Sequence, residues 1–231
     1  MMNVALRLDG FLHGSAPPTP AQAARIAATA ALAGVDSLAV LLPATDASGW
    51  KVPLERIREV FDGPVLVICP LLDDPLRLVH DIRPELTVFT GDGFLPLDRD
   101  DLAGPVARDA VQAMRTSRAP FVVHVPAIVS LIKAARQLEA EGVLLPAAPL
   151  LYADDTAQAV AAMEELETGA LAASKLGLRV FLDGELDRAS WGALSRLDLF
   201  EGAVVGSSLI DRALLLGLGP AMTELRMLNL H

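Results

Sequence analysis

The feature that most constrains the fold of this chain is an eightfold alternation of short apolar runs and helix-like segments. Each run is continuously apolar, which is typical of parallel strands covered on both faces. The expected strands are 4–8, 36–42, 64–69, 86–89, 120–125, 143–145, 178–182 and 200–205. The expected helices are 20–33, 54–61, 73–82, 106–117, 128–140, 155–176, 190–197, one that begins at Ser207, and 220–228.

Eight such units in 231 residues predict an α/β fold, a (β/α)8 TIM barrel with extra helices, built as a single domain over residues 1–231. A doubly wound open sheet is the alternative, but the number of strands and the lack of an early GxGxxG motif argue against it. Thr19 as N-cap, Pro20 at the first helical position and Gly34 as a stop set the bounds of the first helix. The segment 158–176 is long for a barrel helix, and part of it can pack on a neighbouring subunit.

Composition narrows the class of partner. The formal charge of −10 argues against nucleic acid and against an anionic membrane surface. The single cysteine, Cys69, lies in an apolar run and is expected in the core, and one cysteine excludes an internal disulfide framework. The start of the chain lacks the pattern of a signal peptide, and no apolar run approaches the roughly 20 residues of a membrane helix. We therefore expect a cytoplasmic protein.

In a TIM barrel, ligands meet the carboxyl ends of the strands, and phosphate often binds the turns after strands seven and eight. The eighth turn, Gly206-Ser207-Ser208, leads into a helix whose free N–H groups suit an anion, although a serine that merely caps the helix is the alternative. The expected phosphate-binding residues are Gly184, Gly206, Ser207 and Ser208. The expected proton-handling residues are Asp9, Asp183 and Glu185.

Three more residues are candidates for the barrel mouth: Arg7, His124 and Asp154. Arg7 shares its strand parity with Asp9, so the two either brace the wall or bottom of the barrel or face a ligand anion. His124 ends the fifth expected strand and is either catalytic or a hydrogen-bonded packing residue. No metal-binding spacing such as HExxH or paired CxxC occurs, so neither a metal nor a cofactor is expected. The acidic stretch 90–105 is either a lid or a solvated loop.

Several short stretches, taken in order, follow the motifs of one known enzyme family. Residues 7–10 resemble an Asn-x-Asp-His motif after the first strand, and residues 19–24 an Asp-Pro-x-x-Ala-Ala helix entry. Tyr152-Ala153 resembles a Tyr-Ala pair after strand six, residues 172–178 the end of a long helix, and residues 206–217 a phosphate turn and helix. With these stretches in this order, the chain resembles the pyridoxine 5′-phosphate synthase family, whose enzyme closes the ring in one vitamin B6 pathway. The resemblance implies a barrel with added helices, assembled from dimers into octamers, that binds a small phosphorylated ligand.

The departures from the family are as informative as the matches. By this resemblance, the family's His at the end of strand two, Glu in strand three and His after strand seven correspond to Leu41, Ile68 and Gly184. Losing one proton-transfer group typically costs on the order of 10²–10⁴ in rate. The family's arginines after strands one and two are also missing, around 12–15 and 43–49, and Glu185 is a candidate replacement near Gly184.

These observations predict a divergent member of the family without its acid–base set but with a phosphate-type turn. Two alternatives remain: a working pyridoxine 5′-phosphate synthase with replaced catalytic groups, and a non-catalytic oligomeric scaffold. A mouth filled by Leu41, Ile68 and Leu12 favours the scaffold, whereas an open polar pocket favours ligand binding.

Overall fold

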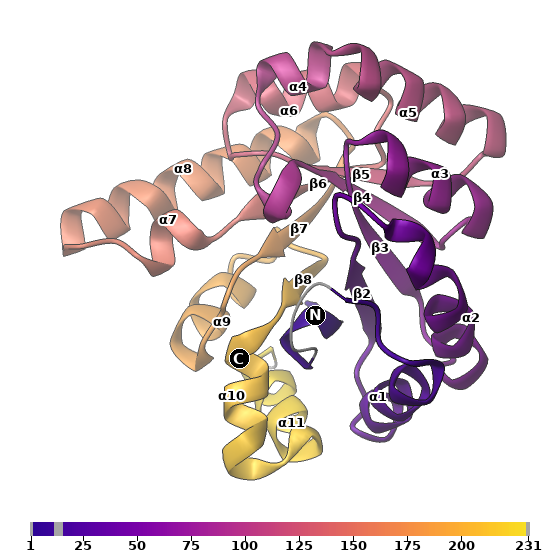
Figure 1. Ribbon diagram of the computed structural model, residues 1–231. Helices are drawn as coiled ribbons and strands as arrows, with labels where there is room; N and C mark the ends of the chain where they lie inside the picture. The colour runs from indigo at the N-terminus through magenta and orange to yellow at the C-terminus, as the bar shows by residue number, and fades with distance from the viewer. Residues whose placement is uncertain (1, 12–15, 230–231) are drawn as a thin grey trace.

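The computed structural model describes residues 2–11 and 16–229, and the eight strands in these residues close into a parallel barrel (Figure 1). The strands are β1 (Asn3–Arg7), β2 (Ser37–Leu41), β3 (Val65–Pro70), β4 (Leu86–Thr90), β5 (Phe121–His124), β6 (Gly142–Pro146), β7 (Arg179–Asp183) and β8 (Gly202–Val205). Each strand pairs with the next along the chain, and β8 pairs with β1 in the register Ala5 to Val204. The predicted TIM barrel is therefore confirmed.

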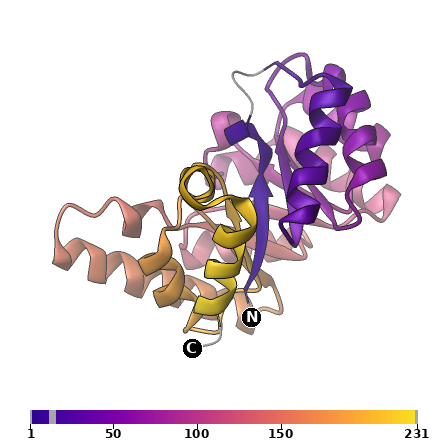
Figure 2. The same cartoon turned by 90° about the horizontal axis from the view of Figure 1, so that it is seen from below.

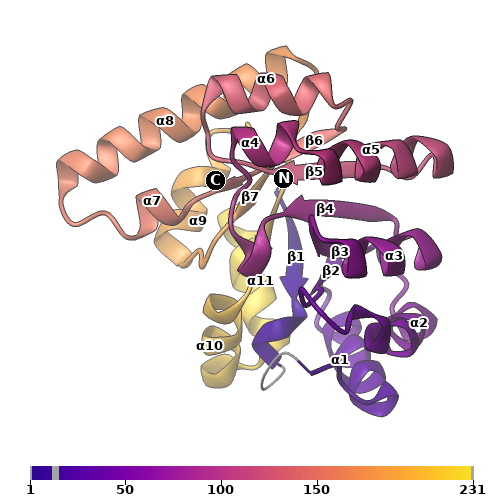
Figure 3. The ribbon, with the colours of Figure 1, turned by 45° about the horizontal axis from the view of Figure 1, so that its top comes forward.

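Helices surround the barrel on its outside, as two further views show (Figures 2 and 3). The α-helices are α1 (Pro20–Leu32), α2 (Lys51–Val60), α3 (Asp73–Ile82), α4 (Arg99–Ala103), α5 (Pro105–Ser117), α6 (Val129–Gln137), α7 (Ala148–Leu151), α8 (Thr156–Lys175), α9 (Arg188–Ser195), α10 (Ser207–Leu216) and α11 (Leu218–Leu228). Three short 3-10 turns are η1 (Leu8–Phe11), η2 (Ala47–Trp50) and η3 (Asp92–Phe94). Within the described residues, none of these helices combines the length and the apolar character needed to cross a membrane.

The first helix begins and ends as its sequence predicts. The Thr19 side chain accepts a hydrogen bond from the Gln22 backbone N–H, and Gln22 reaches back to the Thr19 N–H. This capping box satisfies two donors that the helix itself leaves unpaired. Gly34, just beyond the helix, has a φ of +75°, a conformation that glycine adopts without steric cost.

Two short helices, α4 and α7, were not expected. The segment 90–105 has no apolar periodicity because α4 is only five residues long and mostly charged. Its start is nonetheless well defined, since the Asp98 carboxylate accepts hydrogen bonds from the N–H groups of Asp100 and Asp101. Part of the acidic stretch, Arg99–Ala103, is therefore a capped helix.

The apolar core has two parts, separated by the barrel wall. One fills the space between the strands and the surrounding helices, and includes Cys69, whose thiol pKa is raised by burial. The other lies inside the barrel and is built from small and branched side chains: Ala5, Ala39, Leu66, Ile68, Val88, Val122, Leu144 and Val204. Leu41 packs against this inner cluster from the end of β2. Residues of inward parity beyond the cluster are thereby directed to the mouth.

The α7–α8 hairpin projects away from the barrel (Figures 1 and 2). α8 has 20 residues, about 30 Å of helix, and the residues that it buries, Leu166, Gly169, Ala170 and Ala173, all lie in its second half. In the projecting part, Tyr152 and Val160 are exposed. The sequence-based expectation of a neighbouring subunit here stays a prediction.

The pairing of β6 with β7 leaves no room for a side chain at Gly142, and this can be tested. A Cβ atom at this position would lie 2.5 Å from the Arg179 carbonyl oxygen of the paired strand β7. We expect Gly142→Ala to lower the free energy of unfolding by about 1–3 kcal/mol, because the backbone must shift to relieve the overlap. Urea unfolding followed by circular dichroism measures this.

The matched control is Gly192→Ala within α9, where the nearest atom to an added Cβ is 3.6 Å away. This change removes a helix-interior glycine and should stabilise the protein slightly. Equal effects of the two substitutions would contradict the steric argument at Gly142.

Candidate functional site

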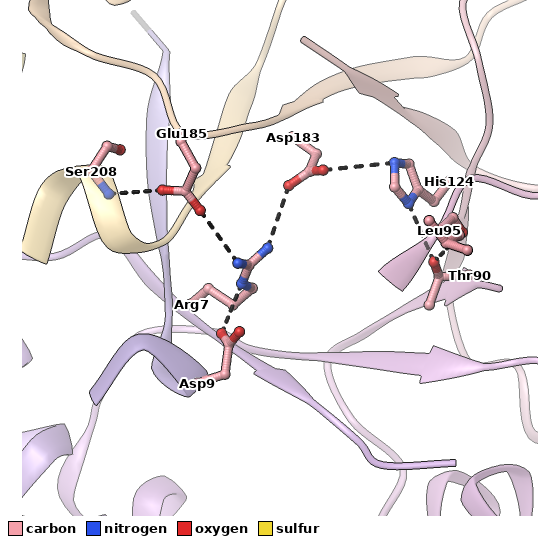
Figure 4. Close-up of polar contacts among 8 residues, drawn as sticks. All are labelled: Arg7, Asp9, Thr90, Leu95, His124, Asp183, Glu185 and Ser208. Atoms are coloured by element: carbon pink, nitrogen blue, oxygen red, sulfur yellow. Dashed lines mark hydrogen bonds and ion pairs between the residues drawn. The ribbon is translucent and has the colours of Figure 1, made fainter. Parts of the chain in front are cut away.

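Arg7 is the centre of a polar cluster at the mouth of the barrel (Figure 4). Its guanidinium Nε lies 2.7 Å from Asp9 Oδ1, Nη2 lies 3.4 Å from Glu185 Oε1, and Nη1 lies 3.8 Å from Asp183 Oδ1. The Arg7 side chain is 17% exposed. One cation therefore serves three carboxyl groups, which come from the ends of β1 and β7. The pairing of Arg7 with Asp9 is as expected from strand parity, and it lies at the mouth, not at the bottom of the barrel.

Asp183 is the most perturbed acid of the cluster. Burial raises the pKa of its carboxyl to about 7; the Arg7 charge opposes this shift, and the charges of Glu185 and Asp9 add to it. A carboxyl group with a pKa close to 7 can both take and give a proton at neutral pH, which is the property that general acid–base catalysis needs.

His124, at the end of β5, faces Asp183 from across the mouth. Its Nε2 lies 3.8 Å from Asp183 Oδ2, and its Nδ1 lies 3.2 Å from the Thr90 hydroxyl at the end of β4. Burial, aided by the charge of Arg7, lowers the pKa of His124 to about 3. The imidazole is therefore neutral at physiological pH.

Phe94, which sequence reasoning did not select, lies between Arg7 and His124. The Arg7 guanidinium carbon is 4.9 Å from the Phe94 ring centroid, a cation–π arrangement, and the His124 ring centroid is 4.8 Å from that of Phe94. Gly93 and Phe94 both have positive φ values, +64° and +65°. A side chain with such a φ is uncommon, and here it places the ring over the mouth. In the sequence, the Gly91-Asp92-Gly93 turn directly before an aromatic residue is the signal that could have pointed to Phe94.

Glu185 occupies the start of α10, where the sequence predicts a phosphate. Its Oε2 accepts a hydrogen bond of 2.7 Å from the Ser208 backbone N–H. The expected alternative, a serine that caps this helix, is wrong: Gly206 is the N-cap residue, and the anionic Glu185 side chain from the seventh turn satisfies the N–H group instead.

Gly206 is required by this contact. A Cβ atom at this position would lie 2.9 Å from Glu185 Oε1 and 3.0 Å from Arg7 Nη2. Any larger residue would thus displace the ion pair between Arg7 and Glu185. Glycine here permits a close approach of the two side chains to the backbone.

Of the other predicted site residues, Gly184 and Ser207 lie beside the mouth, whereas Asp154 does not. The Gly184 N–H is directed at the Val204 carbonyl oxygen at 3.4 Å, and Ser207 is exposed at the first position of α10. Asp154 is exposed in the turn between α7 and α8, where its N–H donates to Gln158, and it does not join the cluster. Leu12, expected to help fill the mouth, lies outside the described residues.

Leu41 and Ile68, which the sequence resemblance leads us to expect at two of the family's proton-transfer positions, belong to the apolar interior. Ile68 is fully buried and Leu41 is half-buried. In residues 2–11 and 16–229, no three His, Cys, Asp or Glu side chains are grouped so that they could hold a metal ion.

Comparison with known proteins gives a family and a fold. The family model described as "Pyridoxal phosphate biosynthesis protein PdxJ" matches residues 67–230. A pyridoxine 5′-phosphate synthase from Synechococcus sp. (strain JA-2-3B'a(2-13)) is 30% identical over 164 residues. That match spans 70% of this chain and 65% of the relative, so somewhat less than two thirds of the relative's length is covered.

Similar solved structures confirm the architecture. The 3-hexulose-6-phosphate synthase of Salmonella typhimurium superposes with a TM-score of 0.66 at 14% identity, over 99% of both chains. A chain of the Amycolatopsis orientalis BexX/CysO complex gives a TM-score of 0.62 at 13% identity, over 100% of this chain and 90% of that one. At such low identity these likenesses show the fold alone.

The perturbed carboxyl makes stability depend on pH in a defined direction. Asp183 has a folded-state pKa of about 7 against an ordinary value of 3.8, so the folded protein holds this proton more tightly than the unfolded chain. The resulting stabilisation is complete below about pH 4 and is lost as the pH rises through 7. Asn carries no charge at any pH. We expect Asp183→Asn to melt a few degrees above wild type at pH 8, with a smaller difference at pH 5, since 1 kcal/mol corresponds to about 2–4 °C at this chain length.

Differential scanning calorimetry from pH 5 to 8 measures this difference. Asp109→Asn, on the exposed face of α5, is the control and should show no such pH trend. A melting-temperature difference for Asp183→Asn that stays constant over this range would contradict the assignment of the raised pKa.

Proposed function

Because the chain belongs to the family of the pyridoxal phosphate biosynthesis protein PdxJ, we propose that its barrel mouth binds a small phosphorylated ligand and handles protons through Asp183. The observation that carries the proposal is the placement of Asp183 beside Arg7 and His124, with its pKa raised to about 7. The family's own acid–base positions cannot do this work here, since Leu41 and Ile68 carry no ionisable group.

Asp183 would exchange protons with the ligand, and Arg7 would stabilise the carboxylate that remains after Asp183 has given its proton away. The guanidinium cannot be deprotonated in a protein, so it acts as a fixed positive charge. Asp9 and Glu185 orient it from two sides, at 2.7 and 3.4 Å. This arrangement suits the proton transfers of a condensation or ring closure on a small substrate. A pyridoxine 5′-phosphate synthase with these replaced groups is the most specific form of the proposal.

The ligand's phosphate would bind at the start of α10, at the Ser208 N–H. A helix of ten residues offers unpaired N–H groups and the positive end of its dipole there. In the structure this N–H group is bonded to Glu185, so a phosphate must displace the Glu185 carboxylate. The Ser208 residue is half-buried, and its buried hydroxyl oxygen has no hydrogen-bond partner in the described residues. This hydroxyl would be a further donor to the phosphate. Gly184 and Ser207 border the same position.

Thermal-shift titration with inorganic phosphate and with pyridoxine 5′-phosphate tests the phosphate site. We expect Glu185→Gln to bind either probe at least about tenfold more tightly than wild type, since the substitution removes a competing charge and keeps the side chain's shape. Ser207→Glu, which adds an anion at the start of α10, should abolish the shift.

Glu201→Gln is the matched control, because Glu201 pairs with Arg179 at the opposite end of the barrel. It should titrate like wild type. If neither probe raises the melting temperature of wild type or Glu185→Gln while both remain folded, the phosphate proposal fails.

A non-catalytic scaffold is the second candidate, and three observations favour it. Leu41 and Ile68 extend the apolar interior toward the mouth, and Glu185 already satisfies the anion position. In addition, Leu214 and Leu215 of α10 are 80% and 78% exposed, an apolar surface suited to a second copy of the chain. A homo-oligomer from dimer to octamer is the assembly that this candidate requires.

A further inference from the structure

Three neighbouring residues, Thr90, His124 and Asp183, lie at the ends of β4, β5 and β7, with His124 between the other two (Figure 4). His124 is 1% exposed, and its Nε2 makes no hydrogen bond among the described residues. A buried polar atom without a partner costs roughly 1–3 kcal/mol, so its orientation calls for an explanation.

Thr90 fixes which ring nitrogen of His124 carries the proton. The Thr90 hydroxyl oxygen lies 2.7 Å from the Leu95 carbonyl oxygen, and two oxygen atoms at that distance repel unless a proton lies between them. A threonine hydroxyl has only one proton, and here it is donated to Leu95. Toward His124 Nδ1, at 3.2 Å, the hydroxyl can therefore only accept. His124 then carries its proton on Nδ1, and Nε2 presents a lone pair.

That lone pair is directed at Asp183. Nε2 and Asp183 Oδ2 are 3.8 Å apart, too far for a hydrogen bond in the structure, and an ionised carboxylate would repel the lone pair at closer range. A protonated Asp183 instead offers an O–H donor that the unpaired Nε2 can accept. A movement of less than about 1 Å would complete this bond at an ordinary O–H···N distance.

The charged groups around Asp183 come from three other places in the fold. Arg7, at the end of β1, favours the ionised form, whereas Asp9 of η1 and Glu185, after β7, oppose it. On the two strands that flank β7, the residues paired with Asp183 are the uncharged Pro146 and Val204. His124 is therefore the neighbour that distinguishes the two oxygens of the carboxyl group, since it faces Oδ2 while Arg7 faces Oδ1.

We propose that Thr90 and His124 are positioning residues that hold the proton of Asp183 on Oδ2, through the Nδ1-protonated tautomer of His124. The proposal deepens the function proposed above, because it explains which oxygen of Asp183 carries the proton, but its geometry needs no ligand. No covalent step is involved. The proton stays on Asp183 Oδ2, which faces the unprotonated His124 Nε2 at 3.8 Å, until a ligand or solvent exchanges it.

Nuclear magnetic resonance on the ligand-free protein tests this directly. Long-range ¹H–¹⁵N spectra distinguish the two imidazole tautomers, and the His124 signals are identified by their loss in His124→Gln. We expect the Nδ1-protonated form. Carbon-13 carboxyl titration, with Asp183 assigned through Asp183→Asn, should give a midpoint near 7 in wild type.

Thr90→Val removes the hydroxyl with little change of shape. The proton on Nδ1 loses its acceptor, so we expect the tautomer to shift toward Nε2 and the Asp183 midpoint to fall by about one pH unit, the value of one ordinary hydrogen bond. Thr87→Val is the matched control on the same strand, since the Thr87 hydroxyl is also buried and has no partner in the described residues. It should leave both readouts unchanged. Thr90→Ser, which keeps the hydroxyl, should restore the wild-type values.

An Nε2-protonated His124 in wild type would overturn the proposal, and this measurement requires no variant to fold. So would an Asp183 midpoint that is equally displaced in Thr90→Val and Thr87→Val. The outcome is separable from that of the phosphate titration: the tautomer and the midpoint are read without ligand, so either proposal can fail while the other stands.

Discussion

Parallel closure of the barrel is the constraint on which every feature of the mouth depends. Because β8 pairs with β1 in register, the carboxyl ends of strands that are far apart in the sequence meet in one ring. Arg7 and Glu185, 178 positions apart, come within 3.4 Å in this way. The interior below them is lined by apolar side chains, so the polar groups that follow the strands gather at the mouth.

Within that ring a single guanidinium organises the charges. Arg7 contacts carboxyl groups on three sides and an aromatic ring on a fourth, so its position is set by the fold as well as by attraction. The three carboxyl groups differ in their distance from this cation and in their exposure. Asp9 makes the shortest contact with the cation. Asp183 is more buried and lies farther from it, so burial raises the pKa of the Asp183 carboxyl. Environment, more than residue type, thus assigns different roles to similar carboxyl groups.

The barrel and much of the mouth could be predicted from the sequence because both follow from local pattern. Continuous apolar runs specify buried parallel strands, and strand parity places Arg7 and Asp9 on the same side. Phe94 could not be predicted in this way, since its position depends on two consecutive positive φ values after Gly91. The contact of Glu185 with the Ser208 N–H depends on the alignment of two neighbouring turns, which no local pattern encodes. Asp154 was expected at the mouth because it follows the sixth expected strand. The short helix α7 lies between that strand and Asp154 and carries Asp154 away from the mouth.

The contact between Glu185 and the start of α10 has a consequence for competition. A carboxylate that belongs to the chain is present at an effective concentration fixed by the covalent connection, commonly in the millimolar range for a flexible link and independent of how much protein or metabolite is in solution. A soluble anion must therefore exceed a local rival that cannot be diluted. In this barrel, occupancy of the helix terminus is consequently governed by the difference in affinity between two anions and not by the affinity of either one alone.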